Sequence, residues 1–181
     1  MRETLRVTDS FQQKVLTLSS LSNSVQAFAN SFSQLSSTLG NLTQDYSTFS
    51  AAMKAANTMA GKGAGDFAKL KGQVSELARE VPVTRDLLAN GLYQVISNGV
   101  PEDDWISFLR DSARSATGGI ADLNKVVGVT STVIKNYGLE WNAAGTIQDK
   151  IQLTAKNGVT SFEQLSDALP QVTGTAATLG V

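Results

Sequence analysis

The N-terminal third of the chain carries apolar residues at alternating intervals of three and four positions. This spacing is an a/d heptad repeat, which keeps one stripe of a helix facing a partner and imposes a left-handed supercoil. Lys14 is the one interruption of the stripe. We therefore predict a coiled-coil helix over residues 1–60. Its predicted oligomer interface, called the seam below, consists of Val7, Phe11, Leu18, Leu21, Val25, Phe28, Phe32, Leu35, Leu39, Leu42, Tyr46, Phe49 and Met53.

The positions that flank this seam are unusual for a coiled coil. Between Lys14 and Asp45 the chain has no charged residue, and the residues off the seam are mainly Ser, Thr, Asn, Gln and Ala. Most coiled coils carry Glu and Lys beside the seam. The seam itself is bulky, with Phe32 and Tyr46 at a positions and Phe28 at a d position. We predict a parallel homo-oligomer and favour a trimer over a dimer, with a hexamer as the alternative.

A glycine-rich segment separates this helix from the rest of the chain. Gly61, Gly63 and Gly65 lie within five residues, with Lys62 between the first two. The spacing matches neither the dinucleotide-binding fingerprint nor the P-loop motif, and no strand precedes it. We therefore predict a hinge over residues 61–66 and not a phosphate-binding loop.

Beyond the hinge the apolar residues keep a helical period, in shorter segments with recognisable ends. The predicted start and stop signals are Pro82, Thr84, Asn98-Gly99, Pro101, Gly118-Gly119, Gly138, Asn157-Gly158 and Pro170. No alternating strand pattern competes with them. The predicted fold is all-α, with a long N-terminal coiled-coil helix, a glycine hinge, and a bundle of about six shorter helices in a domain spanning residues 67–181.

Three details of these helices depend on single residues. Ile120 is expected to begin the buried face of the helix that follows Gly119. Thr160 and Glu163 have the spacing of a capping box at the start of the last helix. Pro170 is expected to end that helix, because proline lacks the backbone N–H that a helix interior needs.

Composition excludes several classes of function. The formal net charge is -1 and the isoelectric point is near 5.4, so no basic field attracts nucleic acid, and we predict no direct nucleic-acid partner. The chain has no histidine and no cysteine, which removes the usual members of catalytic triads and of most metal sites. No run of 18 apolar residues occurs, so no membrane contact is expected from this segment.

Two groups of residues still invite a binding or catalytic role. Glu102, Asp103 and Asp104 are adjacent residues in a first helical turn, where they point in different directions and complement the helix dipole. Trp105 and Trp141 have helical spacing with apolar neighbours, which favours the core over ligand stacking. We therefore predict no catalytic residues, no metal, no cofactor and no enzymatic activity.

Several stretches of the second region resemble the core region of bacteriophage tail tape measure proteins, from about Tyr46 to the end. The most specific is Gly91-Leu92-Tyr93-Gln94, which continues to Val100. Supporting stretches are Phe49-Ser50-Ala51-Ala52-Met53, Leu77-Ala78-Arg79-Glu80, Ser115-Ala116-Thr117-Gly118-Gly119, Tyr137-Gly138-Leu139, the run from Gly158 to Leu165, and Thr178-Leu179-Gly180-Val181. Pro82-Val83 departs from the family, which more often has a glycine-containing turn there. Family members continue well past such a C-terminus, so the chain is expected to be an N-terminal part of something longer.

The resemblance implies a structural protein of the tail lumen, which sets the tube length during assembly and leaves ahead of the DNA. It implies synthesis in the host cytoplasm, a place in the tail tube lumen or tail tip, and contacts with the tail tube, baseplate or tail-tip proteins, and tail assembly chaperones. A helix face without charges would make only weak contacts with a tube wall and would be compatible with sliding. The alternative is a cellular or secretion-apparatus coiled-coil interaction protein, which would explain the seam but not the tape-measure-like segments.

Overall fold

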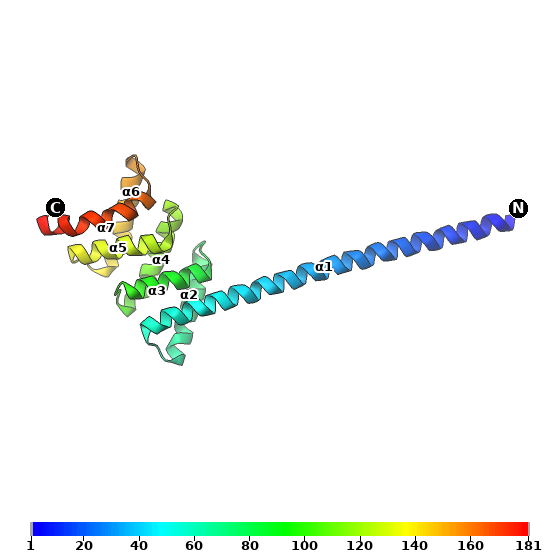
Figure 1. The fold of residues 1–181 in the computed structure, drawn as a ribbon, viewed down its shortest axis with the longest axis horizontal. Helices are drawn as coiled ribbons and strands as arrows, with labels where there is room; N and C mark the ends of the chain where they lie inside the picture. The colour runs from blue at the N-terminus through cyan, green and yellow to red at the C-terminus, as the bar shows by residue number, and fades with distance from the viewer. Residues whose placement is uncertain (1, 181) are drawn as a thin grey trace. The chain divides into compact units, whose positions relative to one another are not determined.

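The computed structural model describes the backbone of residues 2–180 and the side chains of residues 23, 25–41 and 43–180. Over that range the secondary structure is helical and contains no strand, which confirms the predicted all-α class (Figure 1). One long helix is followed by six shorter ones, as the sequence predicts. The chain divides into two compact units, unit 1 (Met1–Tyr46) and unit 2 (Ser47–Val181).

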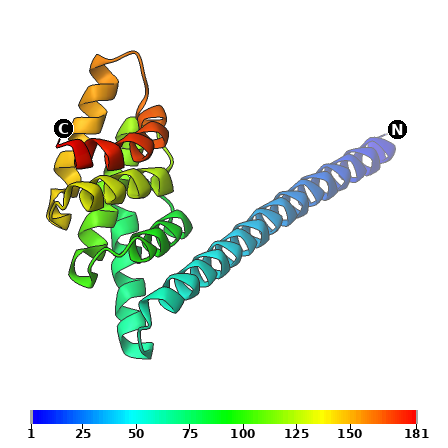
Figure 2. The same ribbon diagram turned by 60° about the vertical axis from the view of Figure 1, so that its left-hand side comes forward.

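Helix α1 (Arg2–Ala60) supplies the described residues of unit 1 and also the first residues of unit 2. The remaining helices of unit 2 are α2 (Ala64–Glu80), α3 (Arg85–Ser97), α4 (Trp105–Gly119), α5 (Leu123–Tyr137), α6 (Ala144–Asn157) and α7 (Phe162–Leu179). Short 3-10 turns, Glu102–Asp104 and Trp141–Ala143, lead into α4 and α6. Within unit 2, α5 packs against α7, α4 packs against α6, and α3 contacts both α4 and α5 (Figure 2).

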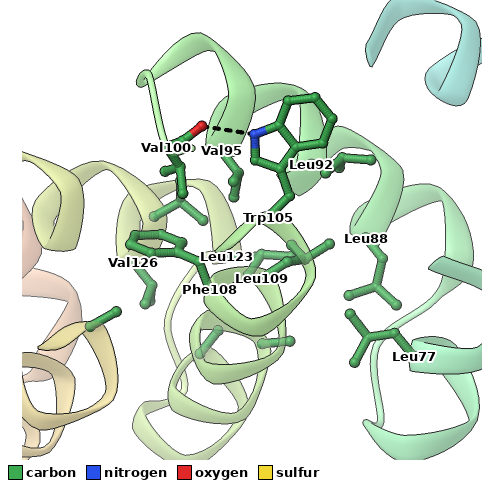
Figure 3. Close-up of a cluster of buried hydrophobic side chains, with 14 of the residues drawn as sticks. Leu77, Leu88, Leu92, Val95, Val100, Trp105, Phe108, Leu109, Leu123 and Val126 are labelled. Carbon is green, nitrogen blue, oxygen red and sulfur yellow. Dashed lines mark hydrogen bonds between the residues drawn. The ribbon is translucent and has the colours of Figure 1, made fainter. Parts of the chain in front are cut away.

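The core of unit 2 is formed by aliphatic side chains from consecutive helices, including Leu88 and Leu92 of α3 and Leu109 of α4 (Figure 3). Trp105 is buried among them, and its indole N–H donates to the backbone carbonyl of Val100 at 2.8 Å. The Trp141 ring packs edge-on against Phe108, with 5.9 Å between centroids. Trp105 therefore belongs to the core, and Trp141 is half-buried against it.

A buried polar network joins three of these helices. The Gln148 amide of α6 donates to the Ser112 hydroxyl of α4 at 3.0 Å and to the Thr130 hydroxyl of α5 at 3.2 Å. The Thr130 hydroxyl donates in turn to the Val126 carbonyl at 2.7 Å. All three side chains are buried. Buried polar groups are costly when they lack hydrogen-bond partners. This network therefore favours the alignment of α4, α5 and α6 in which all three side chains are hydrogen-bonded.

The expectation that Ile120 lies on a buried helix face is wrong. The side chain is 90% exposed, and the residue ends α4 in the left-handed conformation with φ of 50°. Helix α4 continues through Gly118 and Gly119, so the reversal falls on Ile120, and the buried face of α5 begins at Leu123. A β-branched residue in this conformation is strained, because its Cβ approaches the following carbonyl oxygen.

The capping box of α7 lies one residue later than the predicted pair of Thr160 and Glu163. The Gln164 N–H donates to the Ser161 hydroxyl, and the Ser161 N–H donates to the Gln164 side chain, each at 3.1 Å. Glu163 instead accepts a hydrogen bond from the Asp122 N–H at 3.0 Å. It also pairs with a lysine at the start of α5, and these hydrogen bonds lower the pKa of its carboxyl. Because Glu163 contacts the start of α5, the capping box is formed by Ser161 and Gln164.

Pro170 does not end the last helix, which continues to Leu179. An interior proline costs a helix about 3 kcal/mol because it removes a hydrogen bond and crowds the preceding turn. Packing of the C-terminal half of α7 on α5 opposes that cost. Thr173 is buried there, and its hydroxyl accepts a hydrogen bond from the Asn136 amide at 2.8 Å. Tertiary contact therefore outweighs the local signal.

Gly119 is a position where the close approach of two helices requires glycine. A Cβ atom at this residue would lie 2.9 Å from both Cβ and Cγ of Phe162, a buried residue at the start of α7. We expect Gly119→Ala to lower the free energy of unfolding of unit 2 by about 1–3 kcal/mol through overpacking. Denaturant titration followed by tryptophan fluorescence measures this directly, because both tryptophans lie in unit 2.

Gly128 of α5 provides the matched control for this prediction. A Cβ atom there would meet nothing within 4 Å. Gly128→Ala should therefore raise the stability by up to about 1 kcal/mol, which is the helix-propensity difference between the two residues. Equal effects of the two substitutions would show that α4 and α7 do not approach closely at Gly119.

Candidate interaction surface

The part of the seam that lies in unit 1 is exposed wherever the structure describes its side chains. These residues are between 55% and 74% exposed in the chain. They are Val25, Phe28, Phe32, Leu35, Leu39 and Tyr46. A continuous stripe of large exposed apolar side chains is typical of an interaction site, whereas single exposed apolar residues scattered over a surface are not. The heptad spacing further indicates a helical partner.

The other seam residues are not part of this exposed stripe. Val7, Phe11, Leu18, Leu21 and Leu42 lie outside the described side chains. Phe49 and Met53 are buried in the core of unit 2, with 4% and 0% of their surface exposed. Phe49 and Met53 could contact a second copy only after leaving the core of unit 2. Their role in the oligomer interface stays a prediction.

Two cationic side chains of unit 2 lie close to the buried ring of Phe49. The Lys71 ammonium is 5.8 Å from the ring centroid, and the central carbon of the Arg85 guanidinium is 6.0 Å from it. Cations at this distance from an aromatic ring are attracted by the negative charge of its face. Phe49 is thus held by electrostatic contacts as well as by burial.

Several hydroxyl groups on the described part of α1 in unit 1 are hydrogen-bonded within the helix. Ser31, Thr38 and Thr43 each donate to the carbonyl of the residue four positions earlier, at 2.9 Å. Their hydrogen atoms are therefore engaged, and the oxygen lone pairs are left to accept from water. Together with the absence of charge between residues 15 and 44, this gives a face that makes only weak polar contacts with another surface.

The same composition gives the helix little intrinsic stability. Ser, Thr and Asn favour the helix interior less than Ala, Leu, Glu or Lys do, and helices without tertiary contacts are marginal in water. Burial of the seam against a partner would supply the missing stability. The seam is therefore the feature of unit 1 that can hold its helix together.

Unit 2 has a second apolar surface, a groove of about 390 Å³ formed by α5, α6 and α7. Its walls include Val133, Ile147, Ile151, Leu165 and Leu169. Lys150 lies at the groove, and no carboxylate lines it. The groove thus has the chemistry of an apolar contact surface, with Lys150 and Tyr137 as its ionisable lining residues.

Glu102, the first residue of the acidic cluster that precedes α4, is engaged in an ion pair. Glu102 pairs with Lys62, whose ammonium also lies 5.6 Å from the centroid of the Trp105 ring. Among the described residues, no group of three or more His, Cys, Asp or Glu side chains is placed to hold a metal ion. Over the same residues, no helix has the length and hydropathy that a membrane span requires.

Comparison with known proteins gives two matches. The family model described as phage-related minor tail protein matches residues 71–181. A protein of Clostridium phage phiCD119 named probable tape measure protein is 24% identical over 135 residues, which cover 72% of this chain and 14% of that protein. The chain thus spans only a small part of the length of this relative. No solved structure matches.

Proposed function

This chain belongs to the family of phage-related minor tail proteins, and from that premise we propose that it is part of a tape measure protein. Family membership gives a structural role in the phage tail. The proposal adds that the protein lies in the tail tube lumen, sets the length of the tube during assembly, and leaves ahead of the DNA. The similarity to a probable tape measure protein supports this assignment.

The observation that carries the proposal is the exposed seam of α1 in unit 1. A helix has a constant rise of 1.5 Å per residue, so a helix held in a continuous bundle converts residue number into length. The seam supplies the means of bundling, because its heptad spacing lets identical helices pack along one stripe. The charge-free opposite face would let such a bundle move along a tube without ion pairs to the wall.

The proposed partners follow from these two faces. The seam would bind other copies of the same chain in parallel, as a trimer in preference to a dimer, with a hexamer as the alternative. The opposite face and unit 2 would contact the tail tube, the baseplate or tail-tip proteins, and tail assembly chaperones. A cellular or secretion-apparatus coiled-coil protein would share the seam, but it would not account for membership of a tail protein family.

Self-association is the first property to test, with charges placed on the seam. Phe32→Asp combined with Leu39→Asp should convert the oligomer to a monomer, because each substitution buries a carboxylate in the interface. We expect the association constant to fall at least about 100-fold. This change corresponds to less than about 3 kcal/mol, which is a modest cost for two buried carboxylates. Sedimentation equilibrium of the purified chain gives the mass before and after substitution.

Ser33→Asp with Ser37→Asp adds the same charge on the opposite face and is the matched control. It should leave the mass unchanged. A dimer of the unaltered chain would contradict the trimer, and a monomer at all accessible concentrations would contradict self-association through the seam.

A further inference from the structure

The heptad pattern of α1 continues without a break into the core of unit 2. After Tyr46 the next a and d positions are Phe49, Met53 and Ala56, and the helix runs to Ala60. Exposure falls sharply along this one stripe, from 62% at Tyr46 to 4% at Phe49 and to 0% at Met53 and Ala56. The seam is therefore exposed in unit 1, up to Tyr46, and covered by unit 2 of the same chain from Phe49 onward.

We propose that unit 2 and a second copy of this chain compete for the same side chains of residues 47–60. When unit 2 is closed, it covers this part of the seam, and the contact between copies ends near Tyr46. When the end of α1 leaves unit 2, the interface between copies extends by two heptads to Ala60. The inference rests on the proposed self-association and adds a device that sets the extent of the interface.

The residues beside this part of the seam allow such an exchange. The flanking e and g positions are Ser50, Ala52, Asn57 and Met59, and none of them carries a charge. Like charges at these positions would oppose the approach of a second copy. Phe49, Met53 and Ala56 face a partner in either state. Opening also uncovers the side chains of unit 2 that pack on them, so the closed state is favoured when a chain is alone. The contacts of the α1–α2 connection add to that preference.

Those contacts form a polar latch around Lys62, which consists of Asn57, Lys62 and Glu102. The Asn57 amide donates to the Lys62 carbonyl at 3.1 Å, and the Lys62 N–H donates to the Asn57 side chain at 3.2 Å. The Lys62 ammonium pairs with Glu102 and lies beside the ring of Trp105. Because the Glu102 side chain is largely exposed, its ion pair with Lys62 contributes little stability and can break readily.

Cysteine cross-linking of the full chain tests this inference, because the chain has no cysteine of its own. Leu39→Cys and Met53→Cys place a thiol at two a positions of the seam, the first exposed and the second buried in unit 2. Under mild oxidation we expect cross-linked chains from Leu39→Cys. We expect Met53→Cys to react at least about tenfold more slowly, because only the open fraction can react. Ser37→Cys, on the opposite face, reports random encounters.

Release of the latch supplies the second arm. Asn57→Ala with Glu102→Gln, added to Met53→Cys, should raise its cross-linking rate severalfold. Thr58→Ala with Glu76→Gln is the matched control, since it removes one exposed side-chain hydrogen bond of α1 and one carboxylate that pairs with Arg79 at an exposed position of α2. Tryptophan fluorescence verifies that unit 2 stays folded in both.

The outcomes separate this inference from the proposed function. Failure of Leu39→Cys to cross-link above the Ser37→Cys level would overturn self-association itself. If Leu39→Cys cross-links and Met53→Cys does so equally fast in the otherwise unaltered chain, unit 2 does not withhold this part of the seam. If Met53→Cys stays slow after the latch is removed, the interface does not extend. Either of the last two results overturns the inference and leaves the proposed function standing.

Discussion

Removal of four heptads from α1, residues 18–45, should shorten the phage tail by about 42 Å. The expected change is the number of deleted residues multiplied by the helical rise of 1.5 Å. Because whole heptads are removed, Tyr46 follows at its original a position and the seam stays continuous. The deletion leaves unit 2 intact, since that unit begins at Ser47. Electron microscopy of virions that carry the deletion in the complete gene gives the tail length.

Two further variants keep this result interpretable. Duplication of residues 18–45 should lengthen the tail by the same amount. Replacement of these residues by another heptad sequence of equal length should leave the tail length unchanged, because a ruler depends on length and not on side chains. Tails of unchanged length after both deletion and duplication would refute the proposal that this helix measures the tube.

The ends of most helices in unit 2 could be predicted because their signals are local. Gly138 ends α5 with φ of 61°, and Gly99 follows the end of α3 with φ of 72°. Both residues adopt the left-handed conformation that glycine tolerates without a steric penalty. The number and order of the helices follow from such stops and from the helical period of the apolar residues between them. These features need no knowledge of the rest of the fold.

Predictions that depended on contacts between helices were wrong in detail. Thr160 and Ser161 are both acceptable capping residues, and the choice between them depends on the partner of Glu163 at the start of α5. Pro170 is tolerated because α7 packs on α5 beyond it. Ile120 takes a conformation that sequence propensity disfavours, because the chain must reverse after Gly119, where Phe162 lies against α4.

The point at which the exposed part of the seam ends could not be predicted from the sequence, for another reason. A heptad pattern shows that a stripe will be buried, but it does not show whether the same chain or a second copy buries it. Phe49 and Met53 fit the seam as well as Phe32 and Leu39 do, yet unit 2 covers only the first pair. One signal of this boundary is present in the sequence. The charge-free stretch ends at Asp45, just before unit 2 begins.

Charges on the opposite face of α1 should impair release of the protein from the tail. Asn30, Ser33 and Ser37 lie off the seam and are exposed, so their replacement by Lys adds three charges to each copy without touching the seam. An exposed ion pair contributes up to about 1 kcal/mol, so three pairs with the tube wall would slow release roughly 100-fold. A parallel series with Glu covers a wall of the opposite sign. Infectious titre per particle is the readout.

Neutral substitutions at the same three positions separate charge from shape. Gln at all three keeps a polar side chain of comparable length to Glu and should preserve the titre. Electron microscopy of the same particles distinguishes slow release, in which tails have normal length, from a failure of assembly, in which tails are short or absent. The sliding hypothesis requires that Lys or Glu lowers the titre and that Gln does not. Normal titre and normal tail length in both charged series would mean that the charge-free face of α1 has no part in movement through the tube.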